Sequence, residues 1–339
     1  MTSGVQPFVS IVTPMYNEVE YIAECIDSVL AQTYQNWEYI IVDNCSTDGS
    51  AQIARRWADR DHRIRVHENA KFLRAVPNYN AALRQISPTS KYCKVVFADD
   101  WVFPECLERM VQVAEAHPSV GLVGAYALEG NQVVRTGLPY TSTVMSGREV
   151  CRRLFLEHLD VFGSATSLLY RADLVRAQKD FYAEDNIHAD TEVCIDLLKS
   201  CDFGFVHQVL TFTRLRQSSL ITMSRSLNTF AAGIVYHLAI HGRSFLTDAE
   251  FEQCMSRALS GYYRSLAGSL LRGRHRAFWE YHERTLRAAG VGFSRARLVR
   301  ALLARLLAAS LNPKDTIERL LKVNTDETAA FHRELSASK

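Results

Sequence analysis

Two consecutive carboxylates, Asp99 and Asp100, follow a short apolar run near the first third of the chain. The run, Val95 to Phe97, has the β-branched and aromatic residues of a strand that is buried on both faces. Open α/β sheets bind ligands just beyond the carboxyl ends of their strands, so the pair is expected at a binding edge. Carboxylate oxygens suit Mg²⁺ or Mn²⁺, which complete their shells with water and substrate phosphates. The plainer alternative is that both aspartates cap the turn and the helix after Pro104.

Polar residues also follow two predicted strands nearer the N-terminus. Phe8 to Thr13 predicts a buried strand that Pro14 ends, and the polar stretch from Pro14 to Glu18 comes next. Trp37 to Val42 predicts another strand, with Asp43 and Asn44 at its carboxyl end. Parallel strands end at one edge of a sheet, so these residues are expected beside Asp99 and Asp100.

The elements that must position these residues alternate between strand and helix. Helices are expected over residues 20–32, 46–57, 77–86 and 104–117, with a third strand over 64–67. Downstream, the pattern predicts a strand over 121–125, a hairpin at Gly130-Asn131, a helix over 146–156, a strand over 163–170, a helix over 190–199 and a strand over 203–213. Ser146 and Glu149 have the spacing of a capping box. The fold class predicted is α/β, with a mostly parallel sheet and right-handed crossovers.

Composition excludes several classes of protein. The 339 residues carry a formal net charge of +2, which gives no general case for nucleic-acid binding. The eight cysteines are scattered and never form C-x-x-C, so they indicate reduced core residues of a cytoplasmic protein. No G-x-G-x-x-G follows the first strand and no G-x-x-x-x-G-K-[ST] occurs, which argues against the common dinucleotide and P-loop sites.

The sequence predicts two regions and no membrane-spanning segment. No signal peptide is expected before Phe8, and the apolar stretch from Phe230 to Ile240 is too short to cross a bilayer. From about residue 227 the composition changes to arginine-rich helices, so a boundary is expected near 225, with a catalytic region over 1–225 and a helical region over 226–339.

One helix of the second region is amphipathic. Helical spacing from Arg295 to Leu307 predicts an apolar face opposite a basic face. The apolar face would hold Leu298, Val299, Leu302, Leu303, Leu306 and Leu307, and the basic face Arg297, Arg300 and Arg305. Two interpretations stay open: the leucines pack on the catalytic region, or the helix lies in the plane of an anionic membrane surface.

Four motifs in order resemble family two of the inverting glycosyltransferases, which have the GT-A fold. They are Val12-Thr13-Pro14-Met15-Tyr16-Asn17-Glu18, Ser28-Val29-Leu30-Ala31-Gln32-Thr33, Asp43-Asn44-Cys45-Ser46-Thr47-Asp48-Gly49 and Ala98-Asp99-Asp100. The resemblance covers about residues 7 to 220. Each motif alone is a weak signal, and their order at strand ends makes the set specific.

The resemblance implies a nucleotide site on the first two loops. Pro14, Tyr16 and Glu18 would contact the nucleotide, and Asp43 would accept a hydrogen bond from N3–H of the base. The alternative for Asp43 is a helix cap, which Ser46 or Thr47 could supply instead. Arg74 matches a nucleotide-contacting arginine, with a solvated loop charge as the alternative.

The resemblance also implies a metal ion and a positively charged side chain that would bind the diphosphate. Asp100 would bind Mn²⁺ or Mg²⁺, and Asp99 would serve the ribose or the groups around the metal. Phe97 stands where the family often has a further aspartate, which leaves the metal with few protein ligands. Arg216 stands where many relatives have a histidine. A cation there suits the diphosphate, although an exposed basic loop explains it equally well.

A general base is implied at the start of a later helix. Asp190 occupies the position of the base that takes the proton of the acceptor hydroxyl, with Glu192 as the second choice. His188 is expected to make a local hydrogen bond. A carboxylate at a helix start is also a common cap, which is the plainer role for Asp190.

Together these inferences predict an inverting, metal-dependent glycosyltransferase of polysaccharide biosynthesis. It would move a hexosyl or N-acetylhexosaminyl group from a nucleotide-diphosphate sugar, UDP-linked by preference, to a hydroxyl of a glycan or lipid-linked acceptor. The expected location is the cytoplasm, with peripheral contact at the inner membrane surface. A sugar-1-phosphate nucleotidyltransferase is one alternative, and its Gly-rich basic loop is missing between Pro14 and Glu18. A silent nucleotide-sugar sensor or scaffold is the other.

Overall fold

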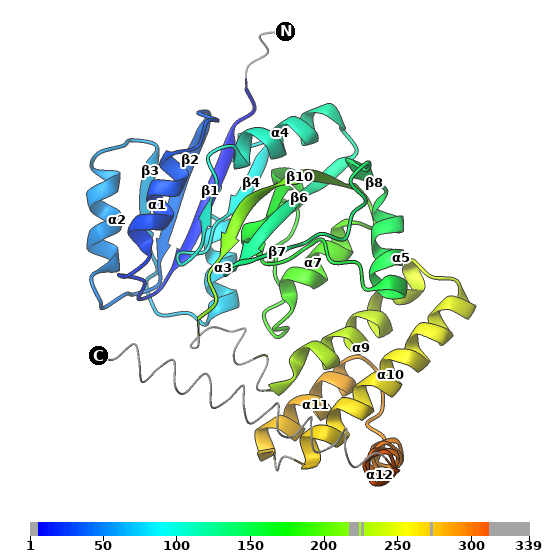
Figure 1. Cartoon of the computed structure of the whole chain (residues 1–339). Coiled ribbons are helices and arrows are strands. Elements are labelled where there is room, and N and C mark those ends of the chain that lie inside the picture. The colour runs from blue at the N-terminus through cyan, green and yellow to red at the C-terminus, as the bar shows by residue number, and fades with distance from the viewer. Residues whose placement is uncertain (1–5, 217–223, 225–226, 272–273, 312–339) are drawn as a thin grey trace. The chain divides into compact units, whose positions relative to one another are not determined.

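The structure, a computed structural model, describes residues 6–216, 224, 227–271 and 274–311 (Figure 1). By packing, the chain divides into two compact units. The first takes in Met1–Ser226 and Ile240–Phe251, and the second Leu227–Ala239 and Glu252–Lys339.

Four parallel strands form one half of the sheet in the first unit. They are β1 (Val9–Met15), β2 (Trp37–Asp43), β3 (Ile64–Glu68) and β4 (Tyr92–Val95), in the order β3-β2-β1-β4. Their connections contain α1 (Ile22–Leu30), α2 (Ser50–Ala58) and α3 (Ala75–Leu83). The register sets Met15 beside Asp43 and Val12 beside Val95. The predicted strand–helix alternation is confirmed, and the polar loops emerge at one edge of the sheet.

The other half of the sheet is mixed. Its strands are β5 (Trp101–Val102), β6 (Val120–Glu129), β7 (Gln132–Val134), β8 (Val144–Met145), β9 (Leu168–Arg171) and β10 (Asp202–Thr213). The order continues β4-β9-β6-β10-β5, with β7 on β6 and β8 on β10. β9 is antiparallel to both β4 and β6, whereas the long β6–β10 pair is parallel. The α/β fold with a mostly parallel mixed sheet is therefore confirmed.

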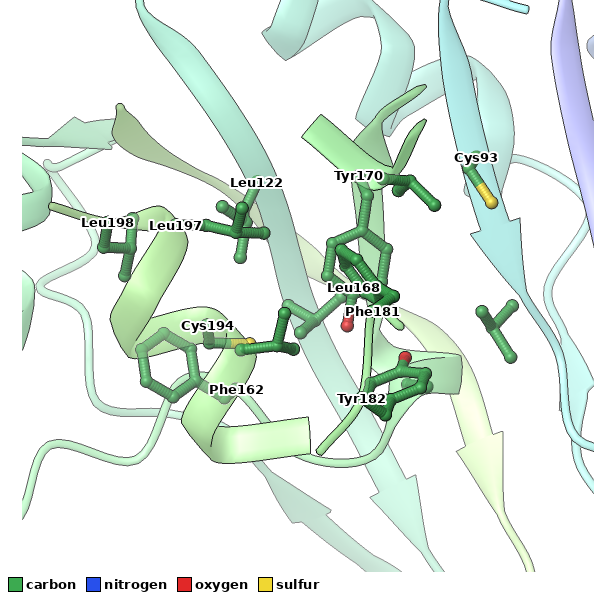
Figure 2. Packing of buried hydrophobic residues seen from close by; sticks show 14 of the residues in the cluster. Cys93, Leu122, Phe162, Leu168, Tyr170, Phe181, Tyr182, Cys194, Leu197 and Leu198 are labelled. Carbon is green, nitrogen blue, oxygen red and sulfur yellow. The ribbon is translucent and has the colours of Figure 1, made fainter. Parts of the chain in front are cut away.

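Alternate side chains of the strands bury themselves on opposite faces, as the two-residue period of a strand requires. Ile11 and Ile41 pack with α1, α2 and α4 (Cys106–Ala116), whereas Val12 and Ile40 pack with helices on the other face. That other face carries α3, α5 (Gly147–Glu157), α6 (Ala172–Arg176) and α7 (Ala189–Leu197). Figure 2 shows Cys194 and Leu197 of α7 among Leu122, Leu168 and other buried side chains of this cluster. Both faces are covered, which explains the nearly continuous apolar strands.

Several predicted boundaries needed correction. Pro14 does not end β1, which runs to Met15. The pairing of β1 with β4 has already ended at Val12, so the N–H that proline lacks is not needed for a hydrogen bond to β4. β4 ends at Val95 and not at Phe97, since the Phe97 amide donates to the Thr166 hydroxyl and leaves the ladder. The strand predicted over 163–170 begins at Leu168, after the 3₁₀ turn η1 (Ala165–Ser167).

Other local predictions are confirmed. Ser146 caps α5 by accepting a hydrogen bond from the Glu149 amide, and Gly130 turns the β6–β7 hairpin at a φ of 60°. All eight cysteines are thiols, and all but Cys45 are buried.

The second region is helical, as predicted. Its helices are α9 (Thr229–His241), η2 (Gly242–Ser244), α10 (Asp248–Leu271), α11 (Arg276–Ala288) and α12 (Arg295–Leu311). In the second unit, Tyr262, Phe278 and Leu286 are central residues of a separate apolar cluster. Within the described ranges, no helix has both the length and the apolar character that a membrane span needs.

The apolar face predicted for α12 is only partly packed. Leu298 packs partly against the apolar cluster of the second unit, and Leu302 is half-buried. Val299, Leu303, Leu306 and Leu307 are exposed, as is Leu311. Arg305 is exposed, and its guanidinium lies close to Gly268 of α10. The leucines therefore divide between a packed side and an exposed side.

Candidate active site

The loops after β1 and β2 are joined to each other by hydrogen bonds. Backbone amides of Asn17, Glu18 and Val19 donate to Ser46 Oγ at 3.0 Å, Ser50 Oγ at 2.8 Å and Asp48 Oδ2 at 2.9 Å. In return, the Thr47 amide donates to Asn17 Oδ1 at 2.8 Å. Asn17 has a φ of 53°, a left-handed conformation that asparagine tolerates. The two loops thus form one rigid surface at the sheet edge.

Asp43 is buried at the end of β2, and it does not cap a helix. Its two carboxylate oxygens accept from the Ser46 amide at 3.3 and 3.2 Å, which closes a tight turn. The helix that follows starts at Ser50 with Gly49 at its N-cap position, and Asp48 accepts from the Ser50 amide. The cap alternative for Asp43 is therefore removed, while the Asp43 carboxylate still has lone pairs for a ligand.

Asn44 holds the loop that leads to Arg74. Its side-chain amide donates to Leu73 O at 2.8 Å and accepts from Leu73 N at 2.9 Å. Arg74 is exposed at the N-cap position of α3. Phe72 in this loop lies against Tyr16, with ring centroids 4.8 Å apart, and both rings are exposed. No role was predicted for Phe72 from the sequence, although an aromatic residue in a polar, irregular loop is a usable signal.

Arg216 bridges two carboxylates that come from different loops. Its guanidinium forms a two-pronged pair with Glu18, at 2.9 Å from Nη1 to Oε2 and 2.8 Å from Nη2 to Oε1. Nη2 also lies 2.6 Å from Asp99 Oδ2. Burial raises the pKa of Glu18 above its ordinary value, and the adjacent guanidinium of Arg216 offsets only part of this effect. The structure thus brings together three residues that were predicted separately.

Asp100 is buried, and both of its oxygens already accept hydrogen bonds. Oδ2 accepts from the Thr166 hydroxyl at 2.7 Å, and Oδ1 accepts from the Arg214 amide at 3.0 Å. Arg214 also donates from Nε to the Asp99 carbonyl at 3.1 Å. Burial, and then the charge of Asp99, raises the pKa of Asp100 to about 7. Neither Thr166 nor Arg214 was given a role from the sequence, because the partners are distant in the chain.

This donor set fits a divalent cation poorly. Both carboxylate oxygens of Asp100 accept hydrogen bonds from the protein, and Oδ2 of Asp99 lies against the guanidinium of Arg216. The side chain of Phe97 has no oxygen to add. Among the residues that the structure describes, no group of three or more His, Cys, Asp or Glu is arranged to hold a metal ion. The assignment of Mn²⁺ or Mg²⁺ to Asp100 stays a prediction that these contacts do not favour.

Asp190 lies in the first turn of α7, where the packed helix fixes its position. The residue is half-buried, and its Oδ1 accepts from the Thr191 amide at 2.8 Å. The N-cap residue is His188, whose side chain makes no capping bond, so Asp190 takes one amide of the first turn. Burial raises the pKa of Asp190, with smaller opposing effects from its hydrogen bond and from the nearby His188. A carboxylate with a raised pKa is a stronger base than a solvated one.

Glu192, the alternative base, is held in structural contacts. Its Oε2 accepts from Asn186 Nδ2 at 2.8 Å, and its Oε1 lies 3.7 Å from His241 Nε2. Asn186 also accepts from the backbone amide of His188 at 2.9 Å, and a hydrogen bond of the His188 side chain stays a prediction. These contacts make Glu192 a support for the start of α7.

Tyr79 of α3 is affected by the charges of both groups of carboxylates, and no role was predicted for it from the sequence. Its ring lies 4.8 Å from the ring of Phe97. Burial raises the pKa of Tyr79, and the negative charges of Asp99 and Asp190 raise it further. The phenol is therefore within electrostatic reach of both carboxylates.

The sequence of the first unit matches a known family. Residues 10–177 match the family model described as Glycosyl transferase family 2. These residues form a glycosyltransferase family 2 domain. The match includes the loops of Asp43, Arg74, Asp99 and Asp100, whereas Asp190 and Arg216 lie beyond it.

Curated relatives of this family 2 domain cover part of the chain. EpsE of Bacillus subtilis (strain 168), a putative glycosyltransferase, is 37% identical over 125 residues, which are 37% of this chain and 44% of EpsE. TuaG of the same strain, a putative teichuronic acid biosynthesis glycosyltransferase, is 36% identical over 107 residues, or 32% of this chain and 42% of TuaG. The chain thus spans less than half the length of either relative.

The fold extends beyond the family 2 domain. The crystal structure of S. aureus TarS 1-349 in complex with UDP-GlcNAc superposes with a TM-score of 0.63 at 16% identity, over 87% of this chain and 89% of that one. At this identity the likeness establishes the fold, which is GT-A with additional C-terminal helices.

Proposed function

We propose that the protein is an inverting glycosyltransferase of polysaccharide biosynthesis. It transfers a hexosyl or N-acetylhexosaminyl group from a UDP-sugar to a hydroxyl of a glycan or lipid-linked acceptor. The family 2 domain and its relatives support glycosyl transfer. A structural neighbour holds UDP-GlcNAc, which supports the choice of UDP for the donor.

The nucleotide binds over the joined loops after β1 and β2. Asp43 accepts the imide N–H of uracil, and a base with an acceptor at that position would leave the carboxylate unpaired. Tyr16 and Phe72 offer exposed aromatic faces beside this position, and a base can stack on such a face. Pro14 shapes the start of the loop. Arg74, at the end of the loop that Asn44 holds, approaches the ribose or phosphates.

Asp190 performs the proton transfer. Its carboxylate takes the proton of the acceptor hydroxyl while the acceptor oxygen attacks the anomeric carbon from the side opposite the diphosphate. The bond from the anomeric carbon to the diphosphate oxygen breaks, and the electron pair leaves with the nucleoside diphosphate. A single displacement of this kind inverts the anomeric centre.

One observation carries the proposal: the negative charges of Asp99, on the donor side, and of Asp190, on the acceptor side, both raise the pKa of Tyr79. A nucleotide sugar that lies across the sheet edge would place its reacting carbon between these carboxylates. A sugar-1-phosphate nucleotidyltransferase needs no base on the far side, and the loop from Pro14 to Glu18 has no glycine or basic residue.

Thermal shift with UDP-, dTDP- and GDP-sugars tests the donor, since a specific ligand stabilises the folded protein by mass action. Only UDP-sugars should raise the melting temperature, and Asp43→Asn should remove the shift. Asp180→Asn, at a surface ion pair with Arg84, is the matched control and should retain it. Slow hydrolysis of the UDP-sugar by the pure protein excludes a silent sensor. A shift with GDP-sugars alone contradicts the assignment of UDP.

We also propose that α12 contacts the inner surface of the cytoplasmic membrane, near lipid-linked acceptors. The exposed side of this helix carries Val299, Leu303, Leu306, Leu307 and Leu311. Arg295, Arg297 and Arg300 are also exposed, and α12 contains no acidic residue. Exposed leucines among arginines suit the boundary between anionic head groups and acyl chains.

A further inference from the structure

A guanidinium lies where the sequence motif predicts a metal site. Asp99 belongs to the Asp-Asp pair at the end of β4, and its Oδ2 is 2.6 Å from Arg216 Nη2. The same guanidinium is paired through both Nη atoms with Glu18. The Cζ atom of Arg216 also lies 5.1 Å from the centre of the Tyr21 ring, within the range of a cation–π contact. The position of this charge is thus set by three different side chains.

A second arginine reinforces the first. Arg214 donates to the Asp99 carbonyl through Nε, forms an ion pair with Glu24, and through its backbone amide holds Asp100. Its guanidinium also contacts the ring of Tyr21, at 4.5 Å. Two permanent positive charges therefore flank the Asp-Asp pair.

Two side chains of this region cannot coordinate a metal. Phe97, two residues before Asp99, has a phenyl ring, and Arg216 has a guanidinium. An imidazole can donate a lone pair to a metal, whereas a guanidinium has only N–H donors and stays charged. A divalent cation on Asp99 would also meet strong repulsion from Arg216 at this distance.

We propose that Arg216 takes the place of the metal ion, and that the protein binds and uses its donor without a divalent cation. This inference rests on the proposed function. The diphosphate of the donor replaces Glu18 as the partner of the guanidinium fork, since planar N–H pairs match phosphate oxygens in the same geometry. Arg216 then stabilises the negative charge that collects on the leaving nucleoside diphosphate.

Calorimetric binding of UDP, in EDTA and in MnCl₂, tests the inference without depending on turnover. Wild-type affinity should agree within about twofold between the two buffers. Arg216→Ala should lose at least tenfold in EDTA, and Arg216→Lys should lose less, because one ammonium keeps the charge but not the fork. Arg276→Ala, at an exposed ion pair on α11, controls for the loss of one positive charge and should bind as wild type.

A gain of metal dependence makes the test stronger. Arg216→His introduces a metal-ligating side chain next to Asp99, and Phe97→Asp adds a carboxylate. The double variant should bind UDP at least tenfold more tightly in MnCl₂ than in EDTA, while the wild type shows no such difference. Turnover of the UDP-sugar should follow the same pattern.

Two binding results would overturn the inference: wild-type affinity for UDP that falls tenfold or more in EDTA and returns with Mn²⁺, or an Arg216→Ala variant that binds UDP as tightly as wild type. Transfer that requires Mn²⁺ would reject the inference and leave glycosyl transfer standing. A wild type that binds UDP equally in both buffers but releases no sugar from its donor would reject the proposed function and retain the inference.

Discussion

The Thr166 hydroxyl donates to Asp100 Oδ2 at 2.7 Å, and both residues are buried. The same hydroxyl accepts from the Phe97 amide at 3.1 Å, and the Thr166 carbonyl accepts from the buried Lys94 ammonium. The η1 turn that carries Thr166 therefore determines the orientation of the Asp100 carboxylate, although it is distant from it in sequence.

Thr166→Val should lower both stability and turnover. The change preserves shape and removes the hydroxyl, which leaves a buried carboxylate oxygen and a buried amide without this partner. The expected loss is about 1–3 kcal/mol in the free energy of unfolding, with turnover reduced at least tenfold. Thr166→Ser keeps the hydroxyl and should recover most of both. Denaturant unfolding and donor turnover, measured on the same preparations, would contradict this if the valine variant equals wild type.

Asp190→Asn should separate chemistry from helix capping. Without a base, turnover should fall by about 10²–10⁴-fold, while UDP affinity stays near that of wild type. A capping role alone would cost about 1 kcal/mol of stability and spare turnover. Glu192→Gln is the matched comparison, because that carboxylate is engaged with Asn186 and His241. Turnover that survives in Asp190→Asn and disappears in Glu192→Gln would transfer the role to Glu192.

The helical unit should lose stability below neutral pH because of His282. This imidazole is fully buried, Tyr262 Oη lies 3.0 Å from its Nδ1, and burial lowers its pKa to about 4. The unfolded chain binds a proton near pH 6.5 and the folded chain does not, so the contribution of neutral His282 is present above that pH. This contribution to the free energy of unfolding is on the order of 3 kcal/mol, and it is lost as the pH falls from about 6.5 to about 4.

Unfolding of the full chain at a series of pH values measures this slope. His282→Leu places an apolar side chain of moderate size, which cannot bind a proton, at this position. The free energy of unfolding should then change less between pH 6.5 and 4. A slope that is unchanged in the leucine variant would assign it to other groups.

The exposed side of α12 should bind anionic vesicles. Each arginine near such a surface contributes about 1 kcal/mol, and inserted leucines add apolar burial. The protein should co-float with vesicles that contain phosphatidylglycerol but not with pure phosphatidylcholine, and salt should release it. Arg297→Glu with Arg300→Glu should abolish flotation. Arg284→Glu with Arg287→Glu, exposed on α11, changes the net charge equally and should not. Equal flotation of the two double variants would refute the role of α12.

Local chemistry explains which parts of this site were predictable. The polar clusters after β1, β2 and β4 could be located because apolar runs end at them and parallel strands share an edge. The Ser146 cap follows from a spacing of three residues. These features depend on short stretches of chain.

Long-range contacts account for what could not be predicted. Thr166 reaches Asp100 because antiparallel β9 is inserted between β4 and β6, and no local pattern indicates that order. Tyr79 comes within electrostatic reach of Asp99 and Asp190 only because α3 and α7 cover the same face. On α12, spacing alone could not tell which leucines meet neighbouring helices. Tertiary packing decides each of these.

The hydrogen bonds between the loops after β1 and β2 constrain how donor preference can change. Asn17 and Glu18 in one loop depend on Ser46 and Ser50 in the other, and Thr47 depends on Asn17 in return. A substitution that moves either loop to admit another base therefore leaves amides of its neighbour without acceptors. Altered nucleotide specificity should require exchange of both segments, residues 14–19 and 43–50, as a single cassette, and single-loop chimeras should lose folding stability before they gain a new donor.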